Sequence, residues 1–436
     1  MTISSSLNAG VAGLNANANK LATISDNIAN SNTYGYKRAQ ADFYAVVIHG
    51  DSATSYSAGG VRSTNMRLID ERGPLIATSN STDLAVDGRG FMAVTTIASV
   101  KGGDEDYPIS LVTTGSFRPD EDGVLRTSTG QVLMGWPANP DGEVGTYPRD
   151  SMSGLEPVVI NNNQYVGNPT SEMSVGINLP ATATQVGADG DPEPLTVEYF
   201  GNLGTSEALT YTFTPTVPTT GTASSNTWTM SIADSASGGA VVAEYVVTFD
   251  DSQDTGGRLA SVTTISGNDY DPATGSFVLD VGGGSIDVSV GLIGQPGGMT
   301  QLSDTFDPIA VSKDGSTVAS LVSVEMDPNG YLRAIYDQGF TRVIYQVPVI
   351  DVPNPNGLIA ANNQTYLLSN NSGPFYLWDA GDGPTGSVAG YSREESSADV
   401  AAELTQLITT QRAYSSNAKV IQTADEMLQE TTNIKR

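Results

Sequence analysis

Cysteine is absent from this sequence of 436 residues, and histidine occurs once, at His49. The absence of cysteine excludes disulfides, thiolate metal sites and a cysteine nucleophile. His49 ends the apolar run 46–48 and has no nucleophile motif near it, so we interpret it as an incidental polar residue rather than a catalytic base. Enzymes that use only carboxylates, such as glycosidases, remain compatible with this composition.

Positive charge is also scarce, because 20 Lys and Arg face 48 Asp and Glu, for a net charge of −28. A surface this acidic repels phosphate backbones and anionic lipids, so we expect no nucleic-acid partner. No run of 18 apolar residues exists, and we therefore expect no membrane insertion. The first residues lack the charged and apolar regions of a Sec signal peptide, which leaves the cytoplasm or export by another route.

The sequence changes character twice. Residues 1–35 and 395–436 have helical spacing, whereas the region between them has short apolar runs separated by Gly, Pro, Asn and Asp. The helical ends are close to neutral, so almost all the negative charge lies in the β region. The sequence therefore predicts a mainly β fold with α-helical termini.

Both ends carry apolar stripes with coiled-coil spacing. The N-terminal stripe consists of Leu7, Leu14, Leu21 and Ile28, with Val11 and Ile24 beside it. The C-terminal seam consists of Leu404, Leu407, Tyr414, Ala418, Ile421 and Leu428, with Gln411 and Asp425 at intervening positions. Polar residues in such a seam fix the register and the number of partners. We also expect Ser397 to cap the C-terminal helix.

The ordinary interpretation of these stripes is that two helices pack on the protein's own core. Two observations favour self-association instead: the helices lie at opposite ends of the chain, and the other face of the first helix is uncharged. A solvated helix face normally carries Lys and Glu. The residues of that uncharged face are Asn8, Asn15, Asn17, Asn19 and Ser25.

The composition predicts a nested domain order. Residues 1–35 and 395–436 form a terminal helical domain that pairs in a coiled-coil-like layer, and 36–70 with 371–394 form a connector. Residues 71–145 and 301–370 form a first β domain, and 146–300 form an inserted β domain. The nested β domains would lie outside the helical layer.

Candidate chemical sites in the β region are weak. The glycine-rich stretches 87–90 and 282–285 precede no helical pattern, which indicates hairpin turns rather than phosphate loops. The acidic stretches 120–123 and 189–191 lack the ligands of an EF-hand, which indicates turns. We therefore predict no catalytic residue, no metal site and no cofactor, and we expect a protein that is not an enzyme.

Three motifs, in the right order and at the right ends, carry a family resemblance. They are DNIANSNTYGYK at 26–37, TDLAVDGRGF at 82–91 and QRAYSSNAKVI at 411–421. Together they resemble the bacterial flagellar rod and hook proteins. The length and the large β insertion favour the flagellar hook proteins, since the rod proteins are much shorter. The stretches QGFTR at 338–342 and NPNGL at 354–358 are similar to the second β stretch of the hook proteins.

The resemblance implies a structural subunit of the flagellar hook, which self-assembles into a flexible helical tube and acts as a universal joint between motor and filament. It also implies a homopolymer that meets the distal rod protein, the hook cap and the hook–filament junction protein, after export by the flagellar export apparatus without a Sec signal peptide. The location would be extracellular, in the flagellum. The alternatives are a distal rod or other axial protein and an acidic, β-rich surface-layer protein or adhesin.

The predicted polymerisation interface combines both stripes with two residues of the first motif. Its residues are Leu7, Leu14, Leu21, Ile24, Asn27, Ile28, Asn30, Leu404, Leu407, Gln411, Tyr414, Ala418, Ile421 and Leu428. Short amphipathic helices are marginal in water, so we expect these ends to be disordered in the monomer and to fold on assembly.

Overall fold

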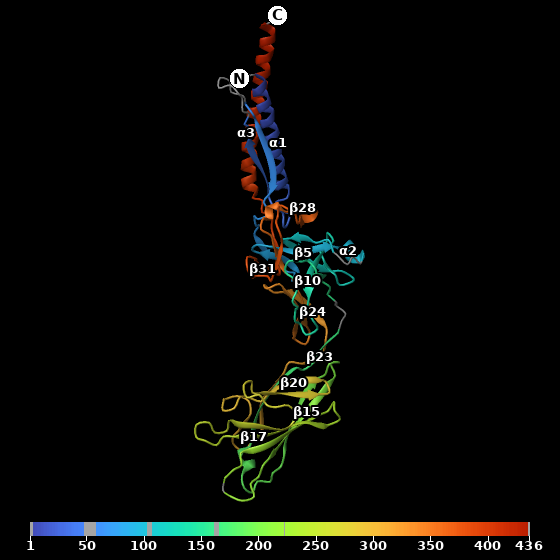
Figure 1. Ribbon diagram of the computed structural model, residues 1–436, viewed down its shortest axis with the longest axis vertical. Coiled ribbons are helices and arrows are strands. Elements are labelled where there is room, and N and C mark those ends of the chain that lie inside the picture. The colour runs from blue at the N-terminus through green and yellow to red at the C-terminus, as the bar shows by residue number, and fades with distance from the viewer. Residues whose placement is uncertain (1–2, 48–57, 103–106, 161–164, 222, 435–436) are drawn as a thin grey trace. The chain divides into compact units, whose positions relative to one another are not determined.

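The computed structural model describes residues 3–47, 58–102, 107–160, 165–221 and 223–434. His49 lies outside these residues. Two long helices form the ends of the chain, α1 (Ile3–Ala29) and α3 (Val400–Ile434). They pack side by side in opposite directions (Figure 1). Most of the chain between them is β-strand and turn. The prediction of a mainly β protein whose terminal helices pair is confirmed.

The end of α1 is set by its own amide side chains and by a glycine. The carbonyl oxygen of Asp26 accepts from both the backbone N–H of Asn30 at 3.0 Å and the side-chain Nδ2 of Asn30 at 2.9 Å. Gly35 then adopts a φ of +69°, and a Cβ there would lie 2.9 Å from Cγ2 of Thr114. Both the backbone conformation and the lack of space require glycine.

The start of α3 corrects one prediction. Asp399 Oδ1 accepts hydrogen bonds from the backbone N–H groups of Ala401 at 2.9 Å and Ala402 at 3.3 Å, so Asp399 is the capping residue. The prediction that Ser397 caps this helix is wrong. Its hydroxyl instead accepts a hydrogen bond from the backbone N–H of Arg38 at 2.9 Å.

The segment expected to be a connector contains a β-hairpin that lies along α1. Strand β1 (Ala39–Ala45) pairs antiparallel with β2 (Val61–Arg67). Asn19 of α1 donates to the hydroxyl of Ser63 on β2 at 2.9 Å, and Gly60 approaches Ala12 closely. We refer to α1, α3 and this hairpin together as the helical layer.

The chain folds into two compact units. Unit 1 comprises residues 1–162, 322–335 and 341–436, and unit 2 comprises 163–321 and 336–340. We expected an insertion at 146–300. The observed unit starts later because β11 (Glu156–Pro157) pairs with β10 (Gln131–Pro137) of unit 1. It ends later because β22 (Asp307–Lys313) pairs with β13 (Glu172–Leu179) of unit 2.

The β part of unit 1 is built from chain segments on both sides of the insertion. Its largest sheet has the order β24-β25-β26-β10-β5-β6-β29-β28, so that β10, before the insertion, pairs with β26, after it. Its core includes Phe91, Trp136, Ile350 and Tyr366.

Its elements up to the insertion are β3 (Leu75–Ala77), β4 (Asp83–Asp87), β5 (Phe91–Thr96), α2 (Ile97–Gly102), β6 (Ser110–Val112), β7 (Thr114–Ser116), β8 (Arg118–Pro119), β9 (Leu125–Arg126), β10 and β11. Those after the insertion are β24 (Leu321–Met326), β25 (Tyr331–Tyr336), β26 (Thr341–Gln346), β27 (Val349–Asp351), η2 (Pro355–Gly357), β28 (Ile359–Ala360), η3 (Asn362–Gln364), β29 (Tyr366–Leu367), β30 (Tyr376–Trp378), β31 (Ser387–Ala389) and β32 (Ser392–Glu394).

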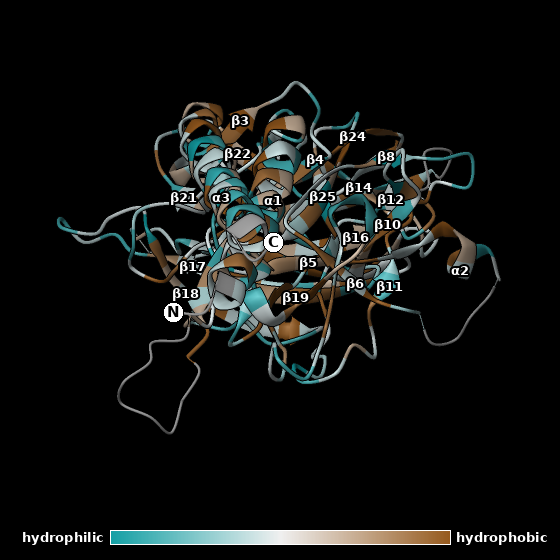
Figure 2. Ribbon diagram, turned by 90° about the horizontal axis from the view of Figure 1, so that it is seen from above, coloured by the Kyte–Doolittle hydropathy of each residue, from teal (hydrophilic) through white to brown (hydrophobic). Residues whose placement is uncertain are grey.

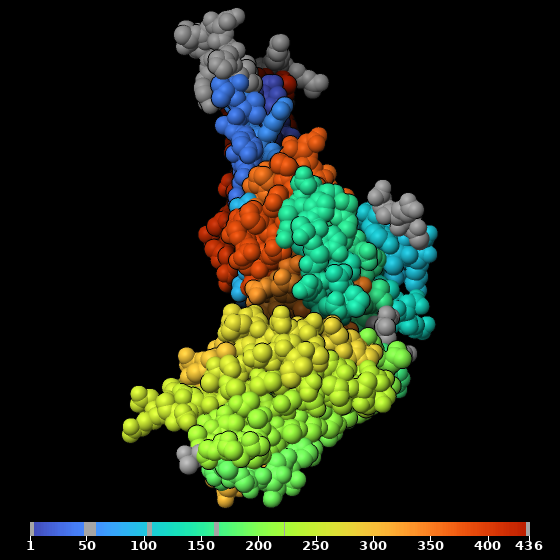
Figure 3. Space-filling view, turned by 60° about the horizontal axis from the view of Figure 1, so that its bottom comes forward, coloured from blue at the N-terminus to red at the C-terminus, as the bar shows by residue number. Residues whose placement is uncertain are grey.

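Unit 2 has two five-stranded sheets that share one hydrophobic core; it is green to yellow in Figure 3. One sheet has the order β14-β15-β16-β17-β18, and its central strand β16 alternates strictly between half-buried and buried side chains, the latter including Trp228, Met230 and Ile232. This period of two is the pattern of a sheet with one face in a core. The strands of unit 2 are β12 (Val166–Asn168), β13, β14 (Glu193–Phe200), β15 (Ser206–Pro215), β16 (Thr227–Asp234), β17 (Ala240–Phe249), β18 (Leu259–Ser266), β19 (Ser276–Val281), β20 (Gly284–Ser289), β21 (Thr300–Gln301), β22 and β23 (Ser316–Ala319), with the short helix η1 (Ala181–Thr184).

Candidate functional site

The two terminal helices approach each other closely where α1 carries glycine. A Cβ atom on Gly10 would lie 3.0 Å from Cγ1 of Ile421, and one on Gly13 would lie 2.8 Å from Nδ2 of Asn417. Larger side chains at these two positions would push the helices apart. Seen end-on, α1 and α3 lie side by side, and each carries both hydrophobic and hydrophilic residues (Figure 2).

The seam between the helices consists mainly of small and polar side chains. Its residues on α1 are Gly10, Gly13, Asn17, Ile24 and Asn27. Its residues on α3 are Glu403, Thr410, Asn417, Ile421 and Ala424. They recur at steps of three, four or seven, which is coiled-coil spacing. Since the isoleucines are its only large apolar side chains, the seam fixes the register of the helices but buries little apolar surface.

The structure places most of the predicted interface residues beside this seam. Ile24 and Asn27 are buried. The half-buried residues are Leu7, Leu14, Leu21, Ile28, Asn30, Leu407 and Ile421. The exposed residues are Leu404, Gln411, Tyr414, Ala418 and Leu428. The contact within one chain is therefore made by the neighbouring stripe, and the leucine stripe stays partly uncovered.

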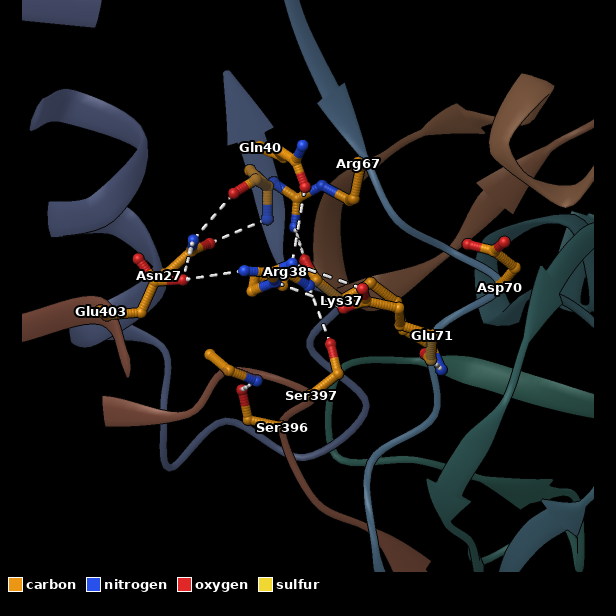
Figure 4. A network of polar contacts seen from close by, with 12 residues as sticks. Asn27, Lys37, Arg38, Gln40, Arg67, Asp70, Glu71, Ser396, Ser397 and Glu403 are labelled. Carbon is orange, nitrogen blue, oxygen red and sulfur yellow. Dashed lines mark hydrogen bonds and ion pairs between the residues drawn. The ribbon is translucent and has the colours of Figure 1, made fainter. Parts of the chain in front are cut away.

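Asn27 is buried at the lower end of the seam, where it joins three elements. Its Oδ1 accepts from the N–H of Ala39 and its Nδ2 donates to the C=O of Ala39, both at 2.8 Å. The same Nδ2 donates to Oε1 of Glu403 at 3.0 Å (Figure 4), and the oxygen of the Tyr36 hydroxyl lies 3.1 Å from Oδ1. The bonds to Ala39 and Glu403 use both N–H donors of the amide and one acceptor position of its oxygen. Asn27 therefore holds α1, β1 and α3 together within one chain.

The neighbouring residues of the first motif also make contacts within the chain. The Tyr36 hydroxyl donates to Oδ2 of Asp26 at 2.9 Å, and the Arg67 guanidinium lies 4.9 Å from the centre of the Tyr36 ring. Burial, together with the hydrogen bond to Asp26, raises the pKa of Tyr36 to about 12. The Oδ1 atom of Asn30 accepts from the Thr33 hydroxyl at 3.2 Å in the turn that follows α1.

A buried ion pair lies next to this network. Lys37 Nζ lies 2.6 Å from Oε1 of Glu394, and the two side chains are 0% and 1% exposed. Lys37 Nζ also donates to the carbonyl oxygen of Glu71 at 2.8 Å, and Glu394 Oε1 accepts from the N–H of Gly73 at 2.9 Å. Burial lowers the pKa of Lys37, although the carboxylate of Glu394 opposes the shift.

The sequence interpretation missed Glu394 and Glu403, the two buried acids of this region. Glu403 did carry a signal, because Glu403, Thr410, Asn417 and Ala424 recur every seven residues. A heptad repeat of small and polar residues indicates a close contact between helices, just as an apolar heptad repeat does. Glu394 lies in a short strand of three residues and carries no comparable signal.

The acidic stretch at 120–123 forms a turn. Asp120 Oδ1 accepts from the N–H groups of Asp122 and Val124, and Oδ2 accepts from Arg126 at 3.1 Å. The carboxylate is thus occupied by its own turn, as predicted. Among the described residues, no group of three or more acidic or histidine side chains could hold a metal ion. In the same part of the chain, no helix has the length and apolar character needed to cross a bilayer.

Comparison with known families assigns both ends of the chain to one class. Residues 7–37 match the family described as flagella basal body rod protein, and residues 388–434 match the family described as flagellar basal body rod FlgEFG protein, C-terminal. These segments contain α1, its connection to β1 and α3. They define the class as an axial protein of the bacterial flagellum.

Full-length relatives identify the particular family. The chain is 31% identical to the flagellar hook protein FlgE of Brucella suis and 30% identical to that of Rhizobium meliloti, over 100% of each chain. It is 26% identical to FlgE of Escherichia coli K12, over 98% of both chains. The chain belongs to the flagellar hook protein family, and the resemblance inferred from the three motifs is confirmed. A solved structure of Helicobacter pylori hook protein FlgE2 matches with a TM-score of 0.46 and 12% identity, over 72% of this chain and 98% of that one.

Proposed function

We propose that this chain, a structural subunit of the bacterial flagellar hook, polymerises through one apolar face of its paired terminal helices. The observation that supports the proposal is the uncovered apolar surface beside a polar seam. A single chain leaves these side chains in water, and neighbouring copies would bury them.

Seven apolar side chains of the two helices lie on the same face of the pair. On α1 they are Leu7, Val11, Leu14 and Leu21, and on α3 they are Val400, Leu404 and Ile408. At about 100° per residue, each stripe lies roughly a quarter to a third of a turn from its seam, in the same rotational sense. In an antiparallel pair, that sense brings both stripes to one side. We refer to this side as the apolar face; the β1–β2 hairpin packs on the opposite side of α1.

The three α3 side chains of the apolar face are strongly exposed for aliphatic residues in a helix. Val400, Leu404 and Ile408 are 39%, 48% and 50% exposed. Burying a side chain of this size contributes about 1.5–3 kcal/mol relative to leaving it in water. Several such residues repeated on every copy favour association, and contacts that do not close into a ring extend into a helical filament.

The end of α3 offers a second contact for neighbours. The contacts of Gly10 with Ile421 and of Asn27 with Glu403 set the register, which places Ile3 close to residue 427. The last residues of α3 therefore extend beyond Ile3 (Figure 1). Met427 and Leu428, where this extension begins, are 56% and 39% exposed. A neighbouring copy would cover them.

In the assembled hook, this face would line the inner layer of a flexible helical tube that transmits torque as a universal joint. The strongly acidic β surface would lie outside, where small hydrated contacts can shift during bending. Residues 163–321 hold 18 Asp and Glu against two Lys and Arg, which fits such contacts. We also propose contacts with the distal rod protein, the hook cap and the hook–filament junction protein. Export by the flagellar apparatus, without a Sec signal peptide, would precede assembly outside the cell.

The test places a charge in the apolar face. Leu14→Asp should abolish polymer formation, because the buried carboxylate would have no partner. Asn8→Asp adds the same charge to an exposed position of α1 on another side and should leave assembly intact. Sedimentation and electron microscopy of purified chains measure the outcome. Normal polymers from Leu14→Asp would contradict the proposed face.

Coupled folding gives a second readout. If the terminal helices fold only on assembly, the circular dichroism signal of helix should rise when monomers polymerise. Equal helix content in both states would refute coupled folding, while leaving the apolar face to be judged by the Asp variants.

A further inference from the structure

The chain passes between the helical layer and the β strands of unit 1 at two places. The first is 68–74, which leads from β2 to β3, and the second is 395–399, which leads from β32 to α3. These two segments lie against each other, since the N–H of Glu395 donates to the carbonyl oxygen of Pro74 at 2.9 Å. We refer to them together as the crossing. Any turning of the helical layer relative to the strands must deform the crossing.

Both members of the Lys37–Glu394 pair are hydrogen-bonded to the first segment of the crossing, and Glu394 directly precedes the second. Lys37 follows α1 and donates to the carbonyl oxygen of Glu71, in the first segment. Glu394 is the last residue of β32 and accepts from the N–H of Gly73, also in the first segment. The backbone of Glu394 additionally accepts from the N–H of Gly35 at 2.8 Å. One ion pair thus links the exit from α1, the path into the β strands and the path back to α3.

Burying this ion pair is an inefficient way to stabilise the fold. Both side chains are essentially inaccessible, and Oε2 of Glu394 is buried without a hydrogen-bond partner. Removing two charges from water costs several kcal/mol each, and apolar residues of similar volume often stabilise a protein as much or more. Burial lowers the pKa of Lys37 more than the attraction to Glu394 raises it, which also indicates that burying this charge is unfavourable.

An ion pair supplies what apolar packing does not, namely a defined direction. A contact of 2.6 Å between Nζ and Oε1, with further bonds to two backbone groups, is satisfied in one arrangement of the segments. Apolar side chains would pack equally well in several arrangements of these segments. Buried polar groups fix register and orientation in this way in coiled coils.

We propose that Lys37 and Glu394 are positioning residues that fix the angle between the helical layer and the β strands of unit 1, so that the crossing is a rigid lever in the assembled polymer. The inference rests on the proposed function, because it assigns a mechanical role within the polymer. It places the bending of the polymer elsewhere than at the crossing.

The experiment separates stability from orientation. The double variant Lys37→Met with Glu394→Leu replaces the pair by apolar side chains. Because the chain contains no cysteine, Thr64→Cys on β2 and Asp122→Cys in the β part of unit 1 provide two unique sites for spin labels. Both positions are exposed. Labelled chains, diluted into unlabelled full-length chains, are assembled, and the distance distribution between the labels is measured by pulsed electron paramagnetic resonance.

We expect the double variant to unfold at a temperature no lower than the parent chain and to show a distance distribution roughly twice as wide. The matched control removes another ion pair of unit 1, Arg89 to Asp351, which is also 2.6 Å long but joins ends of β strands. Its double variant, Arg89→Met with Asp351→Leu, should keep the narrow distribution.

Two results would overturn the inference. A markedly lower unfolding temperature of the Lys37→Met, Glu394→Leu chain would show that the pair serves cohesion, and a distribution as narrow as that of the parent would show that orientation does not depend on it. Failure of the parent chain itself to polymerise would instead contradict the proposed function.

Discussion

The seam of the terminal helices and the core of unit 2 are held together by opposite kinds of contact. Unit 2 buries a continuous apolar cluster that includes Trp228, Tyr211 and Phe213, each 0% exposed. The helical seam buries Asn17, Asn27, Glu403 and Thr410, with few large apolar residues. A cluster of the first kind stabilises a domain by itself, whereas a seam of the second kind mainly fixes geometry. This difference is what a subunit needs if its ends are to be completed by other copies.

The same contrast appears in the buried acids of the two regions. Asp234 in unit 2 accepts from Tyr199, Ala236, Ser237 and Gly282, so both of its oxygens are satisfied. Glu403 in the seam has an Oε1 that accepts from Asn27 and an Oε2 with no partner. A buried oxygen without a donor costs free energy. The carboxylate of Glu403 is therefore less well satisfied than that of Asp234.

The largest expected effect is a loss of packing in unit 2. Phe213→Ala should destabilise unit 2 by about 3–5 kcal/mol, because it removes a fully buried aromatic ring. Calorimetry of the full chain should show one transition shifted to lower temperature. Polymers should still form below that temperature, since the helices are unchanged. Val241→Ala, at a position 58% exposed, is the control and should shift nothing measurable. Loss of assembly at low temperature would contradict the claim that unit 2 is stabilised independently of the helices that assemble.

The next effect concerns Asp234 and acid. Burial acts to raise its pKa, but hydrogen bonds from Ser237, Gly282, Tyr199 and Ala236 outweigh it and hold the pKa of Asp234 below its usual range. Since an unfolded Asp titrates near ~3.9, the stabilisation is complete above that pH and is lost as the pH falls through the lower folded pKa. Asp234→Asn should cost about 1–3 kcal/mol at neutral pH. Thermal unfolding measured from neutral pH down to acid should show the gap between parent and variant closing below about pH 4.

A control for that titration is Asp304→Asn, at an exposed position of the same unit. Its unfolding curve should follow that of the parent at every pH. A constant gap between the Asp234→Asn variant and the parent across the acid range would show that the carboxylate charge is not what stabilises unit 2.

A smaller effect is expected at the helical seam, where two tendencies oppose each other. Gly13→Leu should favour an isolated helix by about 0.8 kcal/mol. In the pair, the new side chain would overlap Asn417 and cost about 1–3 kcal/mol. We therefore expect weaker assembly despite a stronger helix former, measured by the critical concentration for polymerisation. Asn8→Leu, at an exposed position, is the matched control and should not weaken assembly. Improved assembly of Gly13→Leu would contradict close helix packing.

The smallest effect tests the cap of α3. Asp399→Ala should cost about 1 kcal/mol and speed amide exchange of Ala401 and Ala402 roughly fivefold. Ser397→Ala should leave these amides unchanged and speed exchange of the Arg38 amide instead. Hydrogen exchange followed residue by residue in the assembled polymer distinguishes the two. The reverse pattern would restore Ser397 as the cap.

The sequence by itself determined the class of the fold and the family. Periods of seven at the ends and short apolar runs between them follow from local chemistry, so the terminal helices and the β character of the region between them could be predicted. The motifs at 26–37, 82–91 and 411–421 together identified the family, although not the reason for their residues. The structure supplies that reason for Asn27, whose amide completes bonds to Ala39 and Glu403.

Only the tertiary structure decided which helix faces meet and where the buried charges lie. The leucine stripe has the stronger apolar pattern, yet Gly10 and Gly13 allow the closer approach, and spacing alone cannot rank the two stripes. Lys37 and Glu394 are 357 positions apart, and each belongs to a short irregular or three-residue segment. Their contact arises because two distant parts of the chain cross at one place, which no local pattern records.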